Sequence, residues 1–244
     1  MTDEPSAIDV ERLCVSRNGR RVLDGVSFAA HAGEIVAVVG PNGAGKTTLL
    51  EAMVGLVPST TTRLVARGAA IRSFADRAQT FAYMPDEARL PEETSVRTLL
   101  AAVSNASAAA TDFARRLGAG ALLDRRGGEL SRGEAKRVSL AATLALVRPV
   151  VVLDEPFGAF DPVQLDDVLG VVRDCARLGA AVVVTVHQMS TAERIADRIV
   201  LLAEGRSVAT GSLEELRALA GAPSAPFEDV FRRLLSRPST HAAP

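Results

Sequence analysis

The stretch EIVAVVGPNGAGKTT, residues 34–48, joins a short apolar run to a glycine-rich turn and then to a helical pattern. Residues 40–47 fit the pattern G-x-x-x-x-G-K-[ST], which marks a phosphate-binding loop between a strand and a helix. In such a loop, successive backbone N–H groups form a nest for anions at the start of the helix. The stretch therefore predicts an α/β fold of the P-loop NTPase type.

Two side chains of this loop have separate expected tasks. Lys46 can reach the β- and γ-phosphates of a nucleotide, and the Thr47 hydroxyl can ligate Mg²⁺. The glycines let the backbone turn tightly around the phosphate oxygens. The predicted phosphate-binding residues are Gly40, Asn42, Gly43, Ala44, Gly45, Lys46, Thr47 and Thr48.

Two further apolar runs end in polar residues. The run VVVLDEP, residues 150–156, delivers Asp154 and Glu155 at the carboxyl end of a buried strand, where ligands bind in parallel sheets. We expect Asp154 to hold Mg²⁺ and Glu155 to act as general base toward the attacking water. His187 ends the run at 180–187, so we expect it to sense the γ-phosphate at the same edge.

A fourth motif lies at a helix start, in ELSRGEAKRV, residues 129–138. Ser131 and Glu134 form the pattern of a capping box, yet Arg132 and Gly133 make a poor first turn. Glycine in a helix costs about 1 kcal/mol relative to alanine. A helix start with bare N–H groups is an anion site. The alternative is a capped surface helix with no ligand.

The composition narrows the class of protein. The chain has 244 residues and a formal net charge of −1, which gives no long-range attraction to nucleic acid, so we expect no such partner. Its two cysteines indicate neither a disulfide framework nor a metal site. The acidic N-terminus is unlike a signal peptide, and no apolar run approaches the ~20 residues that a bilayer requires. We therefore expect a cytoplasmic chain that reaches a membrane through a partner.

Alternating apolar runs and helical patterns indicate a parallel sheet with right-handed connections. We expect strands at 8–15, 21–30, 34–40, 62–74, 80–85, 150–155 and 180–187, and a hairpin at 199–210. Helical patterns begin at Lys46 and at Pro162, and the alanine-rich segment 87–130 reads as a helical insertion. The tail, 221–244, reads as a linker, a short amphipathic helix and a disordered end.

Together these motifs resemble the ATP-binding cassette family, the nucleotide-binding subunits of ABC transporters. The resemblance covers about residues 8–212 and rests on the order GPNGAGKTT, LSRGE, VVVLDEP, GAFD and TVH. It implies a RecA-like parallel core with an antiparallel β subdomain and a helical signature subdomain. The implied domain spans 7–217, with the helical part at about 87–147, and 218–244 follow it.

The resemblance also implies how the helix start is used. Ser131, Arg132, Gly133 and Glu134 would meet the ATP held by the phosphate loop of a second subunit, so that two ATP molecules lie between two head-to-tail copies. ATP with Mg²⁺ would close this dimer and hydrolysis would open it. The implied partners are a second nucleotide-binding subunit, as homodimer or heterodimer, and integral-membrane permease subunits on the inner face of the cell membrane.

The sequence departs from the family pattern at several places. Arg132 and Glu134 differ from the usual glycine and glutamine of the signature, and Phe160 replaces a leucine. Arg17 stands where an aromatic residue usually stacks on adenine; a guanidinium can stack on a base, but a solvated turn residue is an equal alternative. Asp86 stands where a glutamine usually contacts Mg²⁺ and water; a carboxylate can ligate the metal but cannot donate a hydrogen bond.

Two other functions are compatible with these motifs. The departures from the pattern fit a degenerate, weakly hydrolysing cassette with a regulatory role. A soluble ABC ATPase that acts outside transport is the second alternative, although such proteins usually carry two cassettes or a long insertion. Segments 83–100 and 211–235 resemble the exporter-type branch whose permeases are separate chains.

Overall fold

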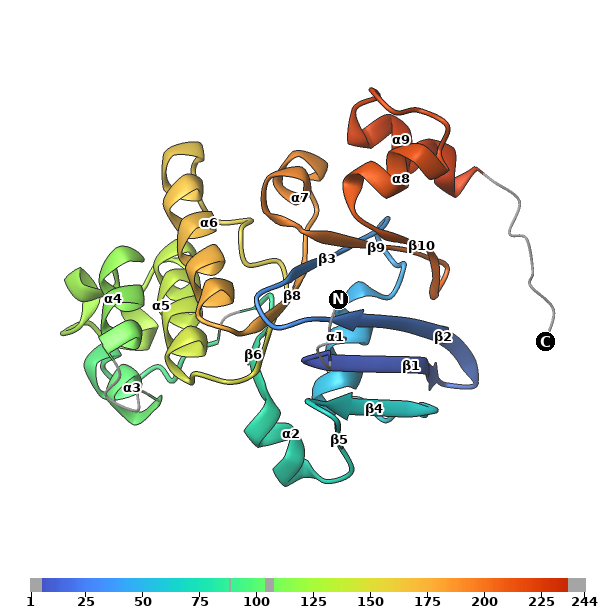
Figure 1. Ribbon diagram of the computed structural model, residues 1–244. Helices are drawn as coiled ribbons and strands as arrows, with labels where there is room; N and C mark the ends of the chain where they lie inside the picture. Colours follow the sequence, from blue (N-terminus) through green and yellow to red (C-terminus); the bar gives the residue numbers. More distant parts are fainter. Residues whose placement is uncertain (1–5, 88, 104–107, 237–244) are drawn as a thin grey trace.

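Two sheets organise the chain, as the computed structural model shows for residues 6–87, 89–103 and 108–236 (Figure 1). The larger sheet has six strands in the order β10-β9-β3-β8-β7-β6, and the smaller has four in the order β2-β1-β4-β5. The strands are β1 Ile8–Arg17, β2 Arg20–Ala30, β3 Ile35–Val39, β4 Arg63–Ala66, β5 Ala69–Ala70, β6 Phe81–Met84, β7 Val150–Leu153, β8 Ala181–Thr185, β9 Arg198–Ala203 and β10 Arg206–Gly211.

The larger sheet is parallel except for β10, which pairs antiparallel with β9, and the smaller sheet is antiparallel. The helices are α1 Lys46–Val54, α2 Phe74–Thr80, α3 Val96–Val103, α4 Ala108–Arg116, α5 Arg132–Ala145, α6 Pro162–Arg177, α7 Met189–Ile195, α8 Leu213–Leu219 and α9 Phe227–Leu235. This confirms the expected α/β fold with a parallel core, an antiparallel β subdomain and a helical part.

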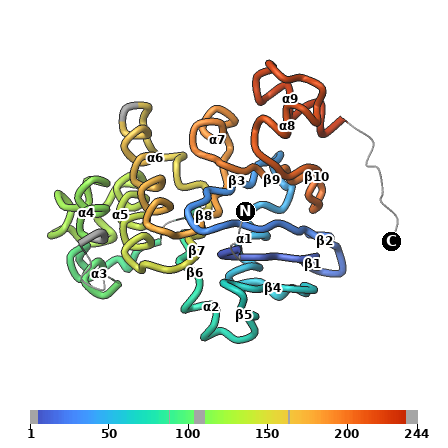
Figure 2. The backbone as a smooth tube through the Cα atoms, in the orientation of Figure 1, coloured from blue at the N-terminus to red at the C-terminus, as the bar shows by residue number. Residues whose placement is uncertain are grey.

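The central parallel strands are buried along their whole length. Every residue of β3, β7 and β8 lies inside the molecule. Both faces of these strands are covered, which is why their sequences are continuous runs of valine, isoleucine and alanine instead of alternating patterns. One face packs against α1 and the smaller sheet, and the other packs against helices that include α5, α6, α7 and α9 (Figure 2).

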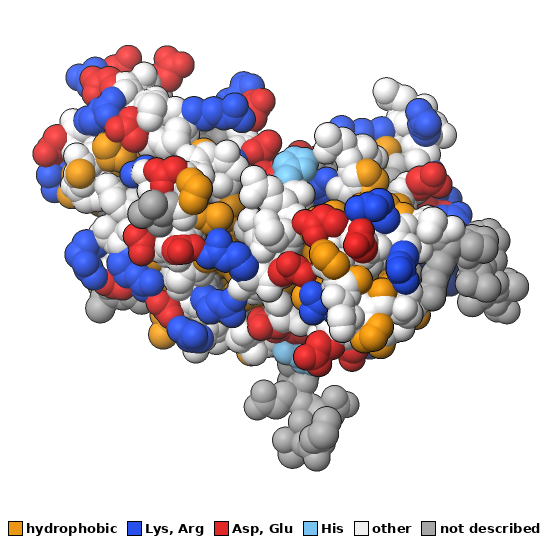
Figure 3. Space-filling model, turned by 90° about the horizontal axis from the view of Figure 1, so that it is seen from above, with side chains coloured by type: hydrophobic (Ala, Val, Ile, Leu, Met, Phe, Trp, Pro, Cys, Tyr) orange, Lys and Arg blue, Asp and Glu red, His pale blue; other side chains and the backbone are white. Residues whose placement is uncertain are grey.

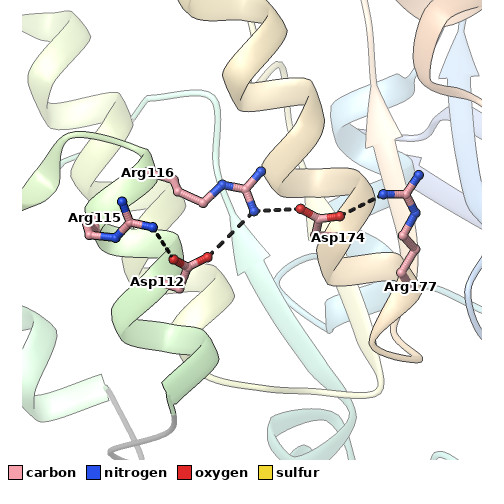
Figure 4. A network of polar contacts seen from close by, with 5 residues as sticks. All are labelled: Asp112, Arg115, Arg116, Asp174 and Arg177. Atoms are coloured by element: carbon pink, nitrogen blue, oxygen red, sulfur yellow. Dashed lines mark hydrogen bonds and ion pairs between the residues drawn. The ribbon is translucent and has the colours of Figure 1, made fainter.

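The helical insertion lies to one side of the larger sheet, opposite the smaller sheet (Figure 1). A network of ion pairs joins it to the core through α4 and α6 (Figure 4). Arg116 on α4 lies 2.6 Å from Asp174 on α6 and 3.7 Å from Asp112, while Arg177 also contacts Asp174. The hydrogen bond from Arg116 is the main reason that the pKa of Asp174 lies below its ordinary value.

One expected strand segment is partly wrong. The sequence predicted strand throughout 62–74, but the strand pair ends at Ala70 and α2 begins at Phe74. The cause is a capping box: Ser73 accepts a hydrogen bond from the Asp76 N–H, and the Asp76 carboxylate accepts one from the Ser73 N–H. The hairpin around Glu204 is confirmed as β9 and β10.

Helix α8 follows the last strand and α9 lies in the tail, and both pack on the helical layer of the larger sheet (Figure 1). Phe227, Val230 and Leu234 of α9 are buried in that layer, which confirms the expected amphipathic helix. The expected disordered end falls on 237–244, outside the described residues. Among the helices of the described ranges, none has the length and apolar character needed to cross a membrane.

The burial of α9 yields a stability prediction. Phe227→Ala should lower the free energy of unfolding by about 3–5 kcal/mol, because Phe227 is fully buried and a cavity would remain. Phe74→Ala is the matched control: Phe74 is 79% exposed, so its loss should change stability by at most ~0.5 kcal/mol. Urea denaturation of both variants measures this. Equal effects would show that α9 does not pack on the core in solution.

Candidate nucleotide-binding site

The phosphate loop connects β3 to α1 with a backbone that only glycine permits at two points. A Cβ on Gly40 would collide with the backbone carbonyl oxygen of Leu202. Gly45 has a φ of 103°, the left-handed region, and precedes the first residue of α1. No side chain caps this helix start, and its first turn has no acidic residue. The N–H groups of the turn are therefore available to an anion.

Lys46 lies within this loop and not in solvent. Its side chain is nearly buried, and its Nζ donates hydrogen bonds to the carbonyl oxygens of Gly40 at 2.9 Å and Pro41 at 3.3 Å. Carbonyl oxygens only partly compensate a buried ammonium, so a negative ligand at this place is favourable. The loop and Lys46 thus present donors suited to phosphate oxygens, and their binding of phosphate stays a prediction.

Asp154 is held behind the loop by Thr185 of β8. The Thr185 hydroxyl donates to Asp154 Oδ1 at 2.6 Å and accepts from the Glu155 N–H at 2.8 Å. Asp154 is fully buried, and its second oxygen, Oδ2, has no hydrogen-bond partner. A buried carboxylate oxygen without a partner is costly, and a hydrated Mg²⁺ is the type of ligand that would compensate it.

The donor set fits magnesium held mainly by a nucleotide. The described residues include no group of three or more His, Cys, Asp or Glu side chains that could hold a metal. Mg²⁺ usually keeps several waters and binds through one or two protein groups plus substrate phosphates. Thr47, which is exposed in the first turn of α1, and Asp154 match that requirement.

Glu155 follows in a strained conformation. Its φ of 50° is left-handed, which is uncommon for a residue with a side chain. The Glu155 side chain is 12% exposed, and its Oε1 lies 3.0 Å from Nε2 of His187. Burial raises its pKa from 4.5 to about 7; Lys46 opposes this rise, and Asp154 adds to it. A carboxylate with such a pKa is suited to accept a proton near neutral pH.

The expected residues come from neighbouring strands. Because β3, β8, β7 and β6 are adjacent and parallel, the phosphate loop, His187, Glu155 and Asp86 all follow the same edge of the sheet. A cavity of about 290 Å³ opens beside Glu155 and His187 and has Phe157, Phe160 and Leu165 in its wall. The Glu155 side chain itself is mostly buried, in agreement with burial as the main cause of its raised pKa.

The start of α5 has the predicted capping box. Ser131 Oγ accepts from the Glu134 N–H at 3.3 Å, and Glu134 Oε2 accepts from the Ser131 N–H at 2.8 Å. Arg125 contacts Glu134 Oε1 at 2.7 Å, and Arg132 is exposed. A Cβ on Gly133 would meet only the Ala159 carbonyl oxygen, at the ordinary contact distance of 3.5 Å. Packing within this chain therefore does not require glycine at 133.

Two residues that depart from the family pattern have partners within the chain. Asp86 Oδ1 lies 2.8 Å from Nζ of Lys136, a buried lysine on α5. Arg17, at the end of β1, lies 3.7 Å from Glu51 of α1 and is largely exposed. Its place beside α1 is compatible with an adenine contact, which stays a prediction.

Sequence reasoning missed Thr185 and Lys136. The segment TVH places Thr185 two residues before His187, so the pattern contained the residue but not its role. Its partner Asp154 is 31 positions away, and only the pairing of β7 with β8 brings them together. The space-filling view shows acidic and basic side chains interspersed over the face it presents, with no field of a single sign (Figure 3).

Comparisons with known proteins agree with this geometry. The family model for ABC transporters matches residues 23–158, more than half of the 244 residues. The lipopolysaccharide export system ATP-binding protein LptB of Haemophilus influenzae is 33% identical and is aligned over 86% of this chain and 92% of its own length. The hemin import ATP-binding protein HmuV of Streptomyces coelicolor is 38% identical over 84% of this chain and 78% of its own.

A solved structure described as the ATP binding subunit of an ABC transporter superposes with a TM-score of 0.86. It is 27% identical, and the superposition covers 95% of this chain and all of that one. The chain therefore belongs to the ABC transporter family, as an ATP-binding subunit that hydrolyses ATP to drive transport.

Proposed function

We propose that the chain hydrolyses ATP at the interface of a head-to-tail dimer and so drives separate permease subunits in the membrane. The observation that carries this proposal is the shared sheet edge at which the phosphate loop, Glu155 and His187 meet. The second subunit is either another copy of this chain or a related cassette. The chain would then work on the cytoplasmic side, attached to the membrane through the permease.

In this proposal each side chain of the edge has one role. Lys46 and the loop N–H groups bind the β- and γ-phosphates. Lys46 exchanges its two carbonyl contacts within the loop for phosphate oxygens. Thr47 and Asp154 would hold Mg²⁺, which neutralises phosphate charge when bound. Glu155 takes the proton of the attacking water, and His187 orients Glu155 and faces the γ-phosphate.

The start of α5 serves the second nucleotide. The capping box uses the N–H groups of Ser131 and Glu134. The N–H groups of Arg132 and Gly133 and the Ser131 hydroxyl therefore bind the γ-phosphate held by the partner subunit, with the Arg132 side chain as an additional positive contact. ATP closes the dimer because both subunits bind the same phosphate, and hydrolysis removes this shared ligand. The energy for opening and closing is thus the differential affinity of the two states for ATP.

Glu155→Gln tests the catalytic role. The variant should bind ATP with affinity similar to wild type but hydrolyse it at least about 100-fold more slowly, because glutamine cannot take the proton. ATP should also hold it as a dimer on size-exclusion chromatography. Lys46→Ala is the comparison: it should lose ATP binding itself. Wild-type turnover in Glu155→Gln would remove Glu155 as the base, and an inactive wild type would favour the degenerate cassette.

Gly133→Ala separates folding from the dimer contact. Within the chain the added methyl group meets only one atom, at 3.5 Å, so stability should stay equal or rise by up to ~1 kcal/mol. ATP-driven dimerisation and hydrolysis should fall about tenfold or more, because the methyl group keeps the partner's phosphate from the N–H groups. Gly120→Ala, which meets nothing within 4 Å, is the control. Unchanged hydrolysis in Gly133→Ala would argue against the contact.

The raised pKa of Glu155 predicts a pH dependence. The base works only when ionised, so kcat/KM should be constant above pH 7 and fall about tenfold per pH unit below it. This ratio reports the nucleotide-free protein, the state in which Glu155 has a pKa of about 7. Steady-state rates between pH 5 and 9 measure it. The fall should persist in His187→Gln, and a midpoint near the ordinary value of 4.5 would contradict it.

A further inference from the structure

Lys136 is a buried lysine that the proposed reaction does not use. It lies on α5, five positions after Ser131, and its side chain is only 5% exposed. Lysine is almost never buried this deeply unless its charge is paired. Its Nζ donates to Asp86 Oδ1 at 2.8 Å, across 50 positions of sequence. The pair therefore joins the loop that follows β6 to helix α5.

Asp86 occupies the edge of the sheet next to the catalytic strand. The Asp154 N–H donates to the carbonyl oxygen of Met84 at 2.9 Å, which fixes the end of β6 beside the end of β7. Two positions later, Asp86 is held by Lys136. Oδ1 is the oxygen that Lys136 contacts, and Asp86 is half-exposed, so the other oxygen can reach a ligand.

The pair is also within electrostatic range of Glu155. Asp86 raises and Lys136 lowers the pKa of Glu155, so the two charges act in opposite directions at the base. Without Lys136, Asp86 would add an uncompensated negative charge next to Glu155 and to the triphosphate. Arg132 and Glu87 line the cleft beside the pair, so the start of α5 and the Asp86 loop meet at one surface.

We infer that Lys136 is a positioning residue for ATP hydrolysis: its ammonium holds the Asp86 carboxylate and its loop against α5 and neutralises that carboxylate at the nucleotide site. The inference rests on the proposed function of the edge formed by the phosphate loop, Glu155 and His187. It assigns to Lys136 a task in turnover in addition to its contribution to folding. A purely structural ion pair would change stability without selectively changing kcat.

Three substitutions at 136 test this. Lys136→Met keeps a long side chain but removes the ammonium, and Lys136→Gln keeps a donor and tolerates partial burial should the methionine variant fold poorly. Lys136→Arg preserves the charge and is the rescue variant. The control is Arg97→Met, which removes one partner of the pair between Arg97 and Asp124; this pair is of similar length, 2.7 Å against 2.8 Å, but exposed. The measurements are kcat and KM for MgATP, and hydrogen exchange of the 86–87 amides without nucleotide.

Removal of the charge should lower kcat about tenfold or more with KM for ATP changed less than about threefold, as for groups that orient ligands of a metal. Exchange of the 86–87 amides should become faster, and Lys136→Arg should restore both readouts. The inference is overturned if a folded Lys136→Met or Lys136→Gln variant has wild-type kcat or wild-type exchange. It is also overturned if Lys136→Arg does not restore the loss or if Arg97→Met reproduces it.

Failure of the proposed function looks different. In that case the wild-type chain would hydrolyse no ATP, or Glu155→Gln would hydrolyse it normally, whatever residue stands at 136. The exchange measurement uses no nucleotide, so it reports the hold of Lys136 on the Asp86 loop independently of hydrolysis.

Discussion

The hydrogen-bonded register of β3, β8, β7 and β6 places the side chains of the candidate site together at one edge of the larger sheet. Parallel strands advance in the same direction, so residues that follow their carboxyl ends gather at one edge. Both faces of these strands are buried. Sliding one strand along its neighbour would carry polar flanking residues into the core, so burial fixes the register. A loop, two carboxylates and an imidazole that lie far apart in sequence thus become neighbours.

The charged groups at this edge are only partly compensated by other groups of the chain. On one side, the ammonium of Lys46 and the uncapped start of α1 are positive. On the other, Asp154 has an oxygen without a partner and Glu155 has a pKa of about 7. Both imbalances cost stability in the free chain, and in the proposed function one ligand pair, a triphosphate and a divalent cation, would relieve them. Part of the expected binding affinity therefore comes from polar groups that the free chain leaves incompletely paired.

The sequence predicted most of this site because its signals are local. The phosphate loop, the acidic strand end and the capping box of α5 each need only a few consecutive residues, and all three have the predicted form. The helix α2 also had a local signal, Ser73 followed by Asp76, which the strand prediction overlooked. The roles of Thr185 and Lys136 could not be derived this way. Each depends on a partner that only the strand order or the packing of α5 brings into reach.

Helix α5 connects the two sides of the proposed dimer mechanism. Ser131 caps its start, its second turn holds Lys136 against Asp86, and Arg137 donates to Gln164 of α6 at 2.6 Å. Arg137 also lies over the ring of Phe160, 5.9 Å from its centre. A helix is stiff along its axis, so displacement of its start by the partner's nucleotide would be transmitted to Asp86 at its own nucleotide site. Asp86 stands where the family usually has an uncharged glutamine. An ion pair holds the loop to α5 over a wider range of positions than a neutral hydrogen bond, which agrees with this transmission.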